Sequence, residues 1–152
     1  MSNKLSEHFT QDELTFSQTA ARKGIDNTPS PEILQNLKRL ALELEEVRSL
    51  LGGNGIRISS GYRCNELNTQ IGGSKTSAHM TGLAADFTVP AFGSVLEVAQ
   101  AIAASNIQFD QLIHEYGTWV HIGLAAQGAA PRRQLLSIFK GTGYLPGIVS
   151  NP

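Results

Sequence analysis

The chain has 152 residues, a length typical of one domain built around a single core. Its composition, with 41% hydrophobic and 16% charged residues, is that of a folded protein and argues against an intrinsically disordered one. Twelve basic residues against 13 acidic ones give a formal charge of -1, so the general basic surface of a nucleic-acid-binding protein is absent.

Cysteine content limits the kinds of metal site that the chain can build. Cys64 is the single cysteine, which excludes an intrachain disulfide and a zinc finger based on thiolates. Any bound metal must rely on carboxylates and on the four histidines, which are His8, His79, His114 and His121.

No apolar run approaches the roughly 18 residues needed to span a bilayer, and the polar start at residues 1–4 lacks the apolar core of a signal peptide. We expect synthesis in the cytoplasm and no insertion into a membrane.

The first predicted helix begins at a capping box. Thr10 and Glu13 have the spacing at which a hydroxyl and a carboxylate satisfy free amides at a helix start. The pattern predicts one short helix from there to about Arg22, with Gly24 as its end.

The second predicted helix is long and one-sided. Ser30 and Pro31 combine an N-cap with proline at the first helical position. Apolar residues then recur at helical spacing until Gly52 and Gly53. Residues 1–54 are therefore predicted to be mostly helical.

From residue 55 the pattern changes to short apolar runs separated by Gly, Ser and Asn. It predicts strands at 56–60, 83–89, 109–115, 119–124 and 134–140, and a helix at 94–104. We expect loops at 61–77 and 125–130, with a tail at 141–152. Helices followed by strands indicate a single α+β domain over 1–152, with N-terminal helices packed on a central antiparallel sheet in 55–140.

The segment from Ser77 to Asp86 contains a candidate pair of metal ligands. His79 and Asp86 can converge only if the chain reverses between them, because seven extended residues span about 23 Å. Gly82 favours such a reversal after Thr81. An Asp that caps a loop beside a hydrogen-bonded His is the alternative at this point.

A predicted hairpin around Tyr116-Gly117-Thr118 brings in further candidates. If its loop has three residues, Glu115 faces Trp119, and His121 shares their face of the sheet. Glu115 and His121 would then lie about 7–8 Å apart, within reach of one bound water. A loop of two or four residues would instead bring His114 to the site and remove Glu115.

Three motifs in order carry a family resemblance. They are Ser59-Ser60-Gly61-Tyr62-Arg63, Ser77-x-His79 with Asp86 seven residues on, and Glu115 followed six residues later by His121. Together they resemble the zinc D-alanyl-D-alanine carboxypeptidase family, which includes phage endolysins and shares its zinc geometry with the hedgehog domain. The opening at residues 5–9 and the long helix are similar to the phage-type branch.

The resemblance implies roles for individual residues. His79, Asp86 and His121 would bind Zn²⁺ and leave the fourth position to water. Glu115 would be the general base, and Arg63 would hold the substrate carbonyl or carboxylate. Residues expected to contact substrate are Ser77, Tyr62 and Trp119.

The chain also departs from the family pattern in two places. Trp119 stands where many members have a second histidine, and Thr118 stands where others have the catalytic carboxylate. Because of Trp119, the substrate contacts that family members make with this histidine cannot be assigned in detail to this chain. Because of the second departure, the role of Glu115 depends mainly on the hairpin register.

The function implied is that of a zinc-dependent peptidase that cuts an amide bond in peptidoglycan stem peptides, either a carboxypeptidase or an endopeptidase. A phage or prophage endolysin would be made without a signal and would reach the wall after release. One alternative is a non-catalytic zinc-containing binding module of hedgehog type. Another is a cysteine hydrolase that uses Cys64 and His79. The bond cut and the oligomeric state are left open, and His8 has no assigned role.

Overall fold

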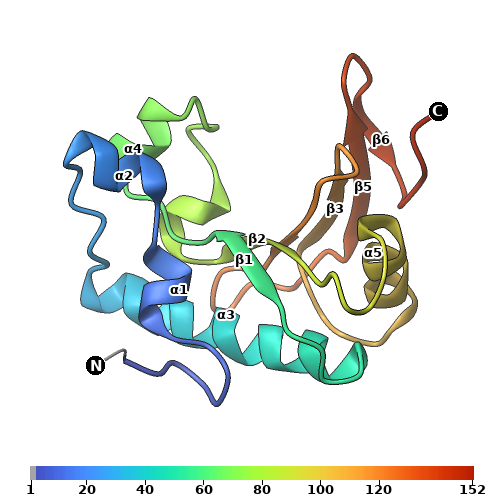
Figure 1. Ribbon diagram of the computed structural model, residues 1–152, viewed down its shortest axis with the longest axis horizontal. Coiled ribbons are helices and arrows are strands. Elements are labelled where there is room, and N and C mark those ends of the chain that lie inside the picture. Colours follow the sequence, from blue (N-terminus) through green and yellow to red (C-terminus); the bar gives the residue numbers. More distant parts are fainter. Residues whose placement is uncertain (1–2) are drawn as a thin grey trace.

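A mixed sheet of six strands, flanked by helices, makes up most of the fold (Figure 1). The computed structural model describes residues 3–152, so the first two residues of the polar start lie outside the described residues. The strand order is β1-β2-β4-β3-β5-β6. The strands are β1 Arg57–Ser60, β2 Ala84–Thr88, β3 Gln111–Glu115, β4 Trp119–Gly123, β5 Gln134–Phe139 and β6 Gly143–Pro146. The helices are α1 Gln11–Thr15, α2 Gln18–Lys23, α3 Pro31–Leu50, α4 Asn65–Gln70, α5 Val95–Ala104 and the 3-10 turn η1 Ala78–Thr81.

The predicted α+β class is confirmed, with a correction to the sheet. All neighbouring strands are antiparallel except β3 and β5, which pair in parallel. The chain after β4 stays at one end of the sheet, where the amide of Gln134 donates to the carbonyl of Asp110. Strand β5 therefore starts beside the start of β3 and runs in the same direction.

The N-terminal helical region differs from the prediction in one respect. The capping box of Thr10 and the helix end at Gly24 are confirmed, but the single helix between them is wrong. Phe16 has extended backbone angles, and the Ser17 hydroxyl then caps a second helix by accepting from the amide of Ala20 at 3.2 Å. A second cap inside the segment thus divides it into α1 and α2.

Two other segments contain elements that the sequence pattern did not reveal. The predicted loop at 61–77 contains α4, whose first turn is capped by the Cys64 sulfur as it accepts from the amide of Leu67. The predicted tail at 141–152 contains β6, which pairs with β5. Cysteine is an uncommon cap, and a four-residue edge strand leaves little periodicity to detect.

One face of the sheet carries the hydrophobic core. Helix α3, which matches its prediction, buries an apolar stripe against the sheet, and α5 covers β3 and β4 on the same side. The core includes Leu40 and Leu44 of α3 and Phe87 and Ile122 of the sheet, all fully buried. Burial of each such side chain contributes about 1.5–3 kcal/mol. Because side chains alternate along a strand, the residues between these core positions lie on the opposite face of the sheet.

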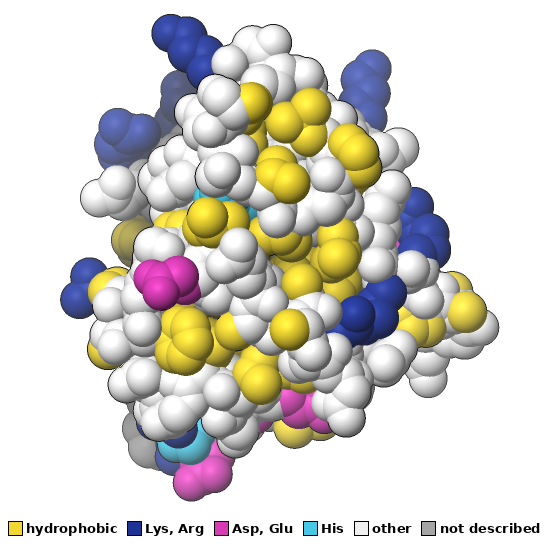
Figure 2. Space-filling model, turned by 90° about the vertical axis from the view of Figure 1, so that its right-hand side faces the viewer, with side chains coloured by type: hydrophobic (Ala, Val, Ile, Leu, Met, Phe, Trp, Pro, Cys, Tyr) yellow, Lys and Arg dark blue, Asp and Glu magenta, His cyan; other side chains and the backbone are white. Residues whose placement is uncertain are grey.

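The surface on the side of α5 and the β5–β6 hairpin is shown in Figure 2. Hydrophobic side chains occupy much of its centre, and Lys and Arg lie toward its margins. Within residues 3–152, none of the helices combines the length and the apolar character required to cross a bilayer.

Candidate metal centre and active site

His79 is presented by the short helix η1. The Ser77 hydroxyl caps this helix by accepting from the amide of His79 at 3.2 Å. Gly82 ends it with a φ of 76°, in the left-handed region that favours glycine. The chain then returns along β2, so the reversal predicted after Thr81 is confirmed and Asp86 comes back toward His79.

The register of the hairpin decides whether Glu115 or His114 faces the site. Glu115 pairs with Trp119 and Ile113 pairs with His121, so the loop has three residues and Glu115 lies on the site face. His114 points to the opposite face, where its Nδ1 lies 2.9 Å from the carbonyl oxygen of Val149. The alternative register, with His114 at the site, is excluded.

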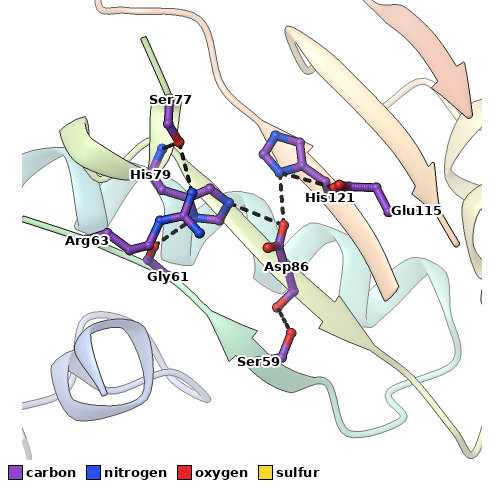
Figure 3. Close-up of polar contacts among 8 residues, drawn as sticks. All are labelled: Ser59, Gly61, Arg63, Ser77, His79, Asp86, Glu115 and His121. Carbon is purple, nitrogen blue, oxygen red and sulfur yellow. Dashed lines mark hydrogen bonds and ion pairs between the residues drawn. The ribbon is translucent and has the colours of Figure 1, made fainter. Parts of the chain in front are cut away.

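Three ligand atoms from three segments converge on this face (Figure 3). Asp86 Oδ1 lies 3.3 Å from Nε2 of His79 and 2.9 Å from Nδ1 of His121. Ligand atoms bound to one tetrahedral Zn²⁺ at about 2.0–2.1 Å lie roughly 3.3 Å apart. Two imidazoles and one carboxylate at these separations therefore fit zinc, and a set of three protein ligands leaves one position open.

The backbone of Gly61 orients the first histidine. Nδ1 of His79 donates to the Gly61 carbonyl at 2.8 Å, which leaves Nε2 unprotonated and directed at the ligand cluster. A Cβ atom on Gly61 would lie 2.3 Å from the carbonyl oxygen of Leu14. Only glycine therefore permits this approach of α1 to the chain that holds His79.

Asp86 is buried yet ionised. Burial raises its pKa, but the side chains of His121 and His79 beside it outweigh this effect and hold the pKa below its usual value. The backbone carbonyl of Asp86 also accepts from the Ser59 hydroxyl at 3.1 Å. A negative charge is thus maintained at the centre of the ligand set.

Glu115 lies beside the cluster without joining it. Its Oε2 is 3.8 Å from Nδ1 of His121. Burial, and then the negative charge of Asp86, raise the pKa of Glu115 above its usual value. A carboxyl group with a raised pKa next to a metal site is suited to accept and return a proton.

Arg63 borders the site from the other side. Its backbone amide donates to the carbonyl of His79 at 3.0 Å, and its Nη2 donates to the Ser77 hydroxyl at 3.1 Å. Burial lowers the pKa of Arg63 below its usual value, and the charges of Asp86 and Glu115 only partly oppose this effect. The guanidinium therefore lies within the field of both acids. Its Nε is buried and has no hydrogen-bond partner among the described residues.

The remaining predicted residues have different surroundings. Tyr62 is largely buried in the core cluster, although it also lines, with Arg63, a pocket of about 460 Å³. Trp119 is half-buried on the site face, with its ring centroid 5.6 Å from that of Tyr116. Cys64 is occupied as a helix cap, which accounts for this thiol without catalysis. His8 binds Glu45 on the surface.

Two side chains near the site were not found from the sequence. Ile138 of β5 lies next to Glu115 in the sheet, and Tyr144 of β6 lies opposite Ile138. The largely apolar run at 134–140 predicted a strand but gave no sign of its parallel pairing with β3. Without that pairing, neither residue could be placed on the site face.

Comparison with known proteins agrees with this geometry. The family model described as Peptidase M15 matches residues 7–123, a range that contains the ligand cluster, Glu115 and Arg63. A search of curated proteins gives no match. Peptidases of family M15 are zinc dependent, which agrees with the donor set of His79, Asp86 and His121. With most of its length matched, the chain belongs to the peptidase M15 family.

Proposed function

We propose that this protein is a zinc-dependent peptidase that hydrolyses an amide bond in the stem peptides of peptidoglycan. The observation that carries the proposal is the placement of Glu115 3.8 Å from a ligand of the His79-Asp86-His121 cluster. A site with three protein ligands and a neighbouring carboxylate has the composition of a hydrolytic metal centre. The hedgehog-type alternative, a binding module, has no need of that carboxylate.

His79, Asp86 and His121 would hold the metal. When bound, zinc supplies a Lewis acid for the substrate carbonyl and for water. Glu115 accepts a proton at a carboxylate oxygen from the attacking water as the new C–O bond forms. It then gives that proton to the amide nitrogen as the C–N bond breaks, so the products are a carboxylic acid and an amine.

Arg63 positions the substrate. Its side chain is held by the Ser77 hydroxyl, and its buried Nε is free of partners among the described residues. A guanidinium presents several donors in one plane, which suits a carboxylate or the oxygen of a polarised carbonyl. We assign Arg63 to one of these groups on the stem peptide.

A phage or prophage endolysin of the D-alanyl-D-alanine type is the finer form of the proposal. It is supported by the motif resemblance around Ser59–Arg63 and His79–Asp86. In this form the protein is made in the cytoplasm and acts on the cell wall after release.

Digestion of isolated murein and of defined muropeptides tests the proposal. Purified protein loaded with zinc is expected to release fragments whose masses identify the bond cut, and a chelator is expected to stop their release. Restored zinc should restore cleavage. Cleavage that persists in chelator, or no cleavage by the zinc-loaded protein, would contradict the proposal.

A further inference from the structure

The C-terminal hairpin extends the face of the sheet that carries the metal ligands. Strands β5 and β6 lie at residues 134–146, outside the range 7–123 that matches the family model. They nevertheless belong to the same sheet, next to β3. This segment therefore adds surface beside a site whose main residues all lie in the matched part.

Strand register places specific side chains of the hairpin on the site face. Gln134 lies beside Gln111, and their side chains are joined by a hydrogen bond of 2.8 Å, so both point to one side. Four residues further on, Ile138 lies beside Glu115 on that same side. Tyr144 faces Ile138 across the β5–β6 pair. A continuous surface thus runs from Glu115 to Tyr144.

Aromatic rings dominate this surface. Tyr144 is 60% exposed and Tyr116 is 47% exposed. The Tyr116 ring is tilted against that of Trp119 at 5.6 Å. Partial burial, and then the charge of Glu115, raise the pKa of Tyr144. We call Tyr116, Trp119, Ile138 and Tyr144 the aromatic shelf.

We propose that the aromatic shelf binds a sugar ring of the glycan strand that carries the stem peptide, a proposal that rests on the peptidoglycan substrate proposed above. A pyranose has apolar C–H faces that pack on aromatic rings and hydroxyl or amide groups that bond to polar tips. Tyrosine and tryptophan offer this combination of an apolar body and a polar handle. None of the four shelf residues is charged, which matches an uncharged sugar better than the acidic peptide.

Arg63 and the aromatic shelf together indicate how the substrate is oriented in the site. Arg63 lies with Ser77 and His79 across the ligand cluster, while the aromatic shelf lies beyond Glu115. Carboxylates of the stem peptide are then expected at Arg63 and the glycan at Tyr144. Tyr144 is two strands from Glu115, about 10 Å at the usual strand spacing, which about three extended residues can span.

Fluorescence of Trp119 tests the binding directly, because this is the single tryptophan of the chain. We expect an oligomer of N-acetylglucosamine to change its emission in the zinc-loaded protein. Tyr144→Ala should weaken the binding about tenfold, and Tyr144→Phe should weaken it less, because the ring remains. Phe92→Ala, which removes another exposed aromatic side chain before α5, is the matched control and should leave the binding unchanged. Absence of binding by the unaltered protein would overturn the proposal.

Kinetics with two substrates separate a sugar from a peptide on the shelf. For a muropeptide that retains its disaccharide, Tyr144→Ala should raise KM about tenfold with little change in kcat. For the free stem peptide, KM should stay within about twofold of the unaltered enzyme. An equal rise for both substrates would place the peptide on the shelf and overturn the proposal. Failure of the proposed function looks different, since neither substrate would then be cut although sugar binding could still be read from Trp119.

Discussion

Two carboxylates are buried to the same degree in different parts of the molecule and behave in opposite ways. Asp86 on the sheet is 9% exposed, and Glu43 on α3 is 8% exposed. Burial raises the pKa of Asp86, but the two histidines beside it outweigh burial and lower this pKa. For Glu43, burial and then the charge of Glu46 raise the pKa to about 8. The neighbouring side chains, rather than the depth of burial, therefore decide whether an acid is held charged.

The surroundings of Glu43 account for this difference. Its Oε2 has no hydrogen-bond partner among the described residues. Arg39, one helical turn away, directs its Nη2 to the carbonyl of Ala125 at 3.1 Å. A buried polar atom without a partner costs about 1–3 kcal/mol. The neighbours of Asp86 on the site face stabilise its negative charge, whereas the neighbours of Glu43 on α3 do not, so Glu43 lowers the stability of the protein.

Removal of the negative charge of Asp86 should have the largest effect on zinc binding and turnover. We expect Asp86→Asn to lower zinc affinity by more than about 100-fold, because loss of an outer partner alone costs 10–100-fold. Turnover of muropeptides should be lost with the metal. Zinc content and turnover measured side by side, with Glu43→Gln as a control that keeps both, test this expectation. An Asp86→Asn protein that retains zinc would contradict the assigned ligand set.

The second largest effect should come from Glu115, the acid beside the cluster. We expect Glu115→Gln to lower kcat by about 10²–10⁴-fold, the range of general base catalysis, and to keep zinc bound. Metal content and kcat on one preparation distinguish this result from loss of the site. Near-normal turnover would show that another group handles the proton.

A third prediction concerns stability and pH. The unfolded chain loses the proton of Glu43 above the ordinary glutamate pKa of 4.5, whereas the folded protein keeps it, so stability declines between about pH 4.5 and about 8. Glu43→Gln should remove this decline. Even one pKa unit corresponds to about 1.4 kcal/mol, so Tm at pH 8 should rise by at least about 3 °C. Thermal unfolding at pH 5 and 8 measures it, and an equal Tm change at both values would contradict the assignment to Glu43.

The smallest effect is expected at Glu46, whose charge contributes to the raised pKa of Glu43. Its side chain is exposed, so solvent screens the interaction. Glu46→Gln should raise Tm at pH 8 by only about 1 °C. The pH range over which stability declines should move down, because the pKa of Glu43 falls. Unfolding curves that do not differ from those of the unaltered protein would show that burial alone sets that pKa.

Local signals predicted much of the fold and the core of the site. Caps at Thr10 and Ser30, and glycines such as Gly82, act within a few residues of the chain, so their effects can be read from the sequence. The same holds for the hairpin, because its three-residue loop fixes which residues face each other. Glu115 could therefore be placed beside His121 from the sequence, subject to the length of that loop.

Features that depend on distant segments were beyond prediction. The parallel pairing of β5 with β3 joins residues more than 20 apart, and the placement of Tyr144 depends on it. The carbonyl of Gly61 as partner of His79 likewise depends on how α1 packs. Neither the charge nor the periodicity of these residues carries such information, because both contacts form only once distant segments have packed together.

The two edges of the sheet bear on how the protein behaves at high concentration. Both outer strands have only four residues, and β6 ends at Pro146, which has no amide to offer a further strand. The other edge strand, β1, is followed at once by a backbone hydrogen bond from Tyr62 to Leu14 of α1. Short, interrupted and partly covered edges give poor templates for pairing between molecules. We therefore expect concentrated solutions of the protein to resist fibril formation, even though the sheet is not closed into a barrel and has two edge strands, β1 and β6.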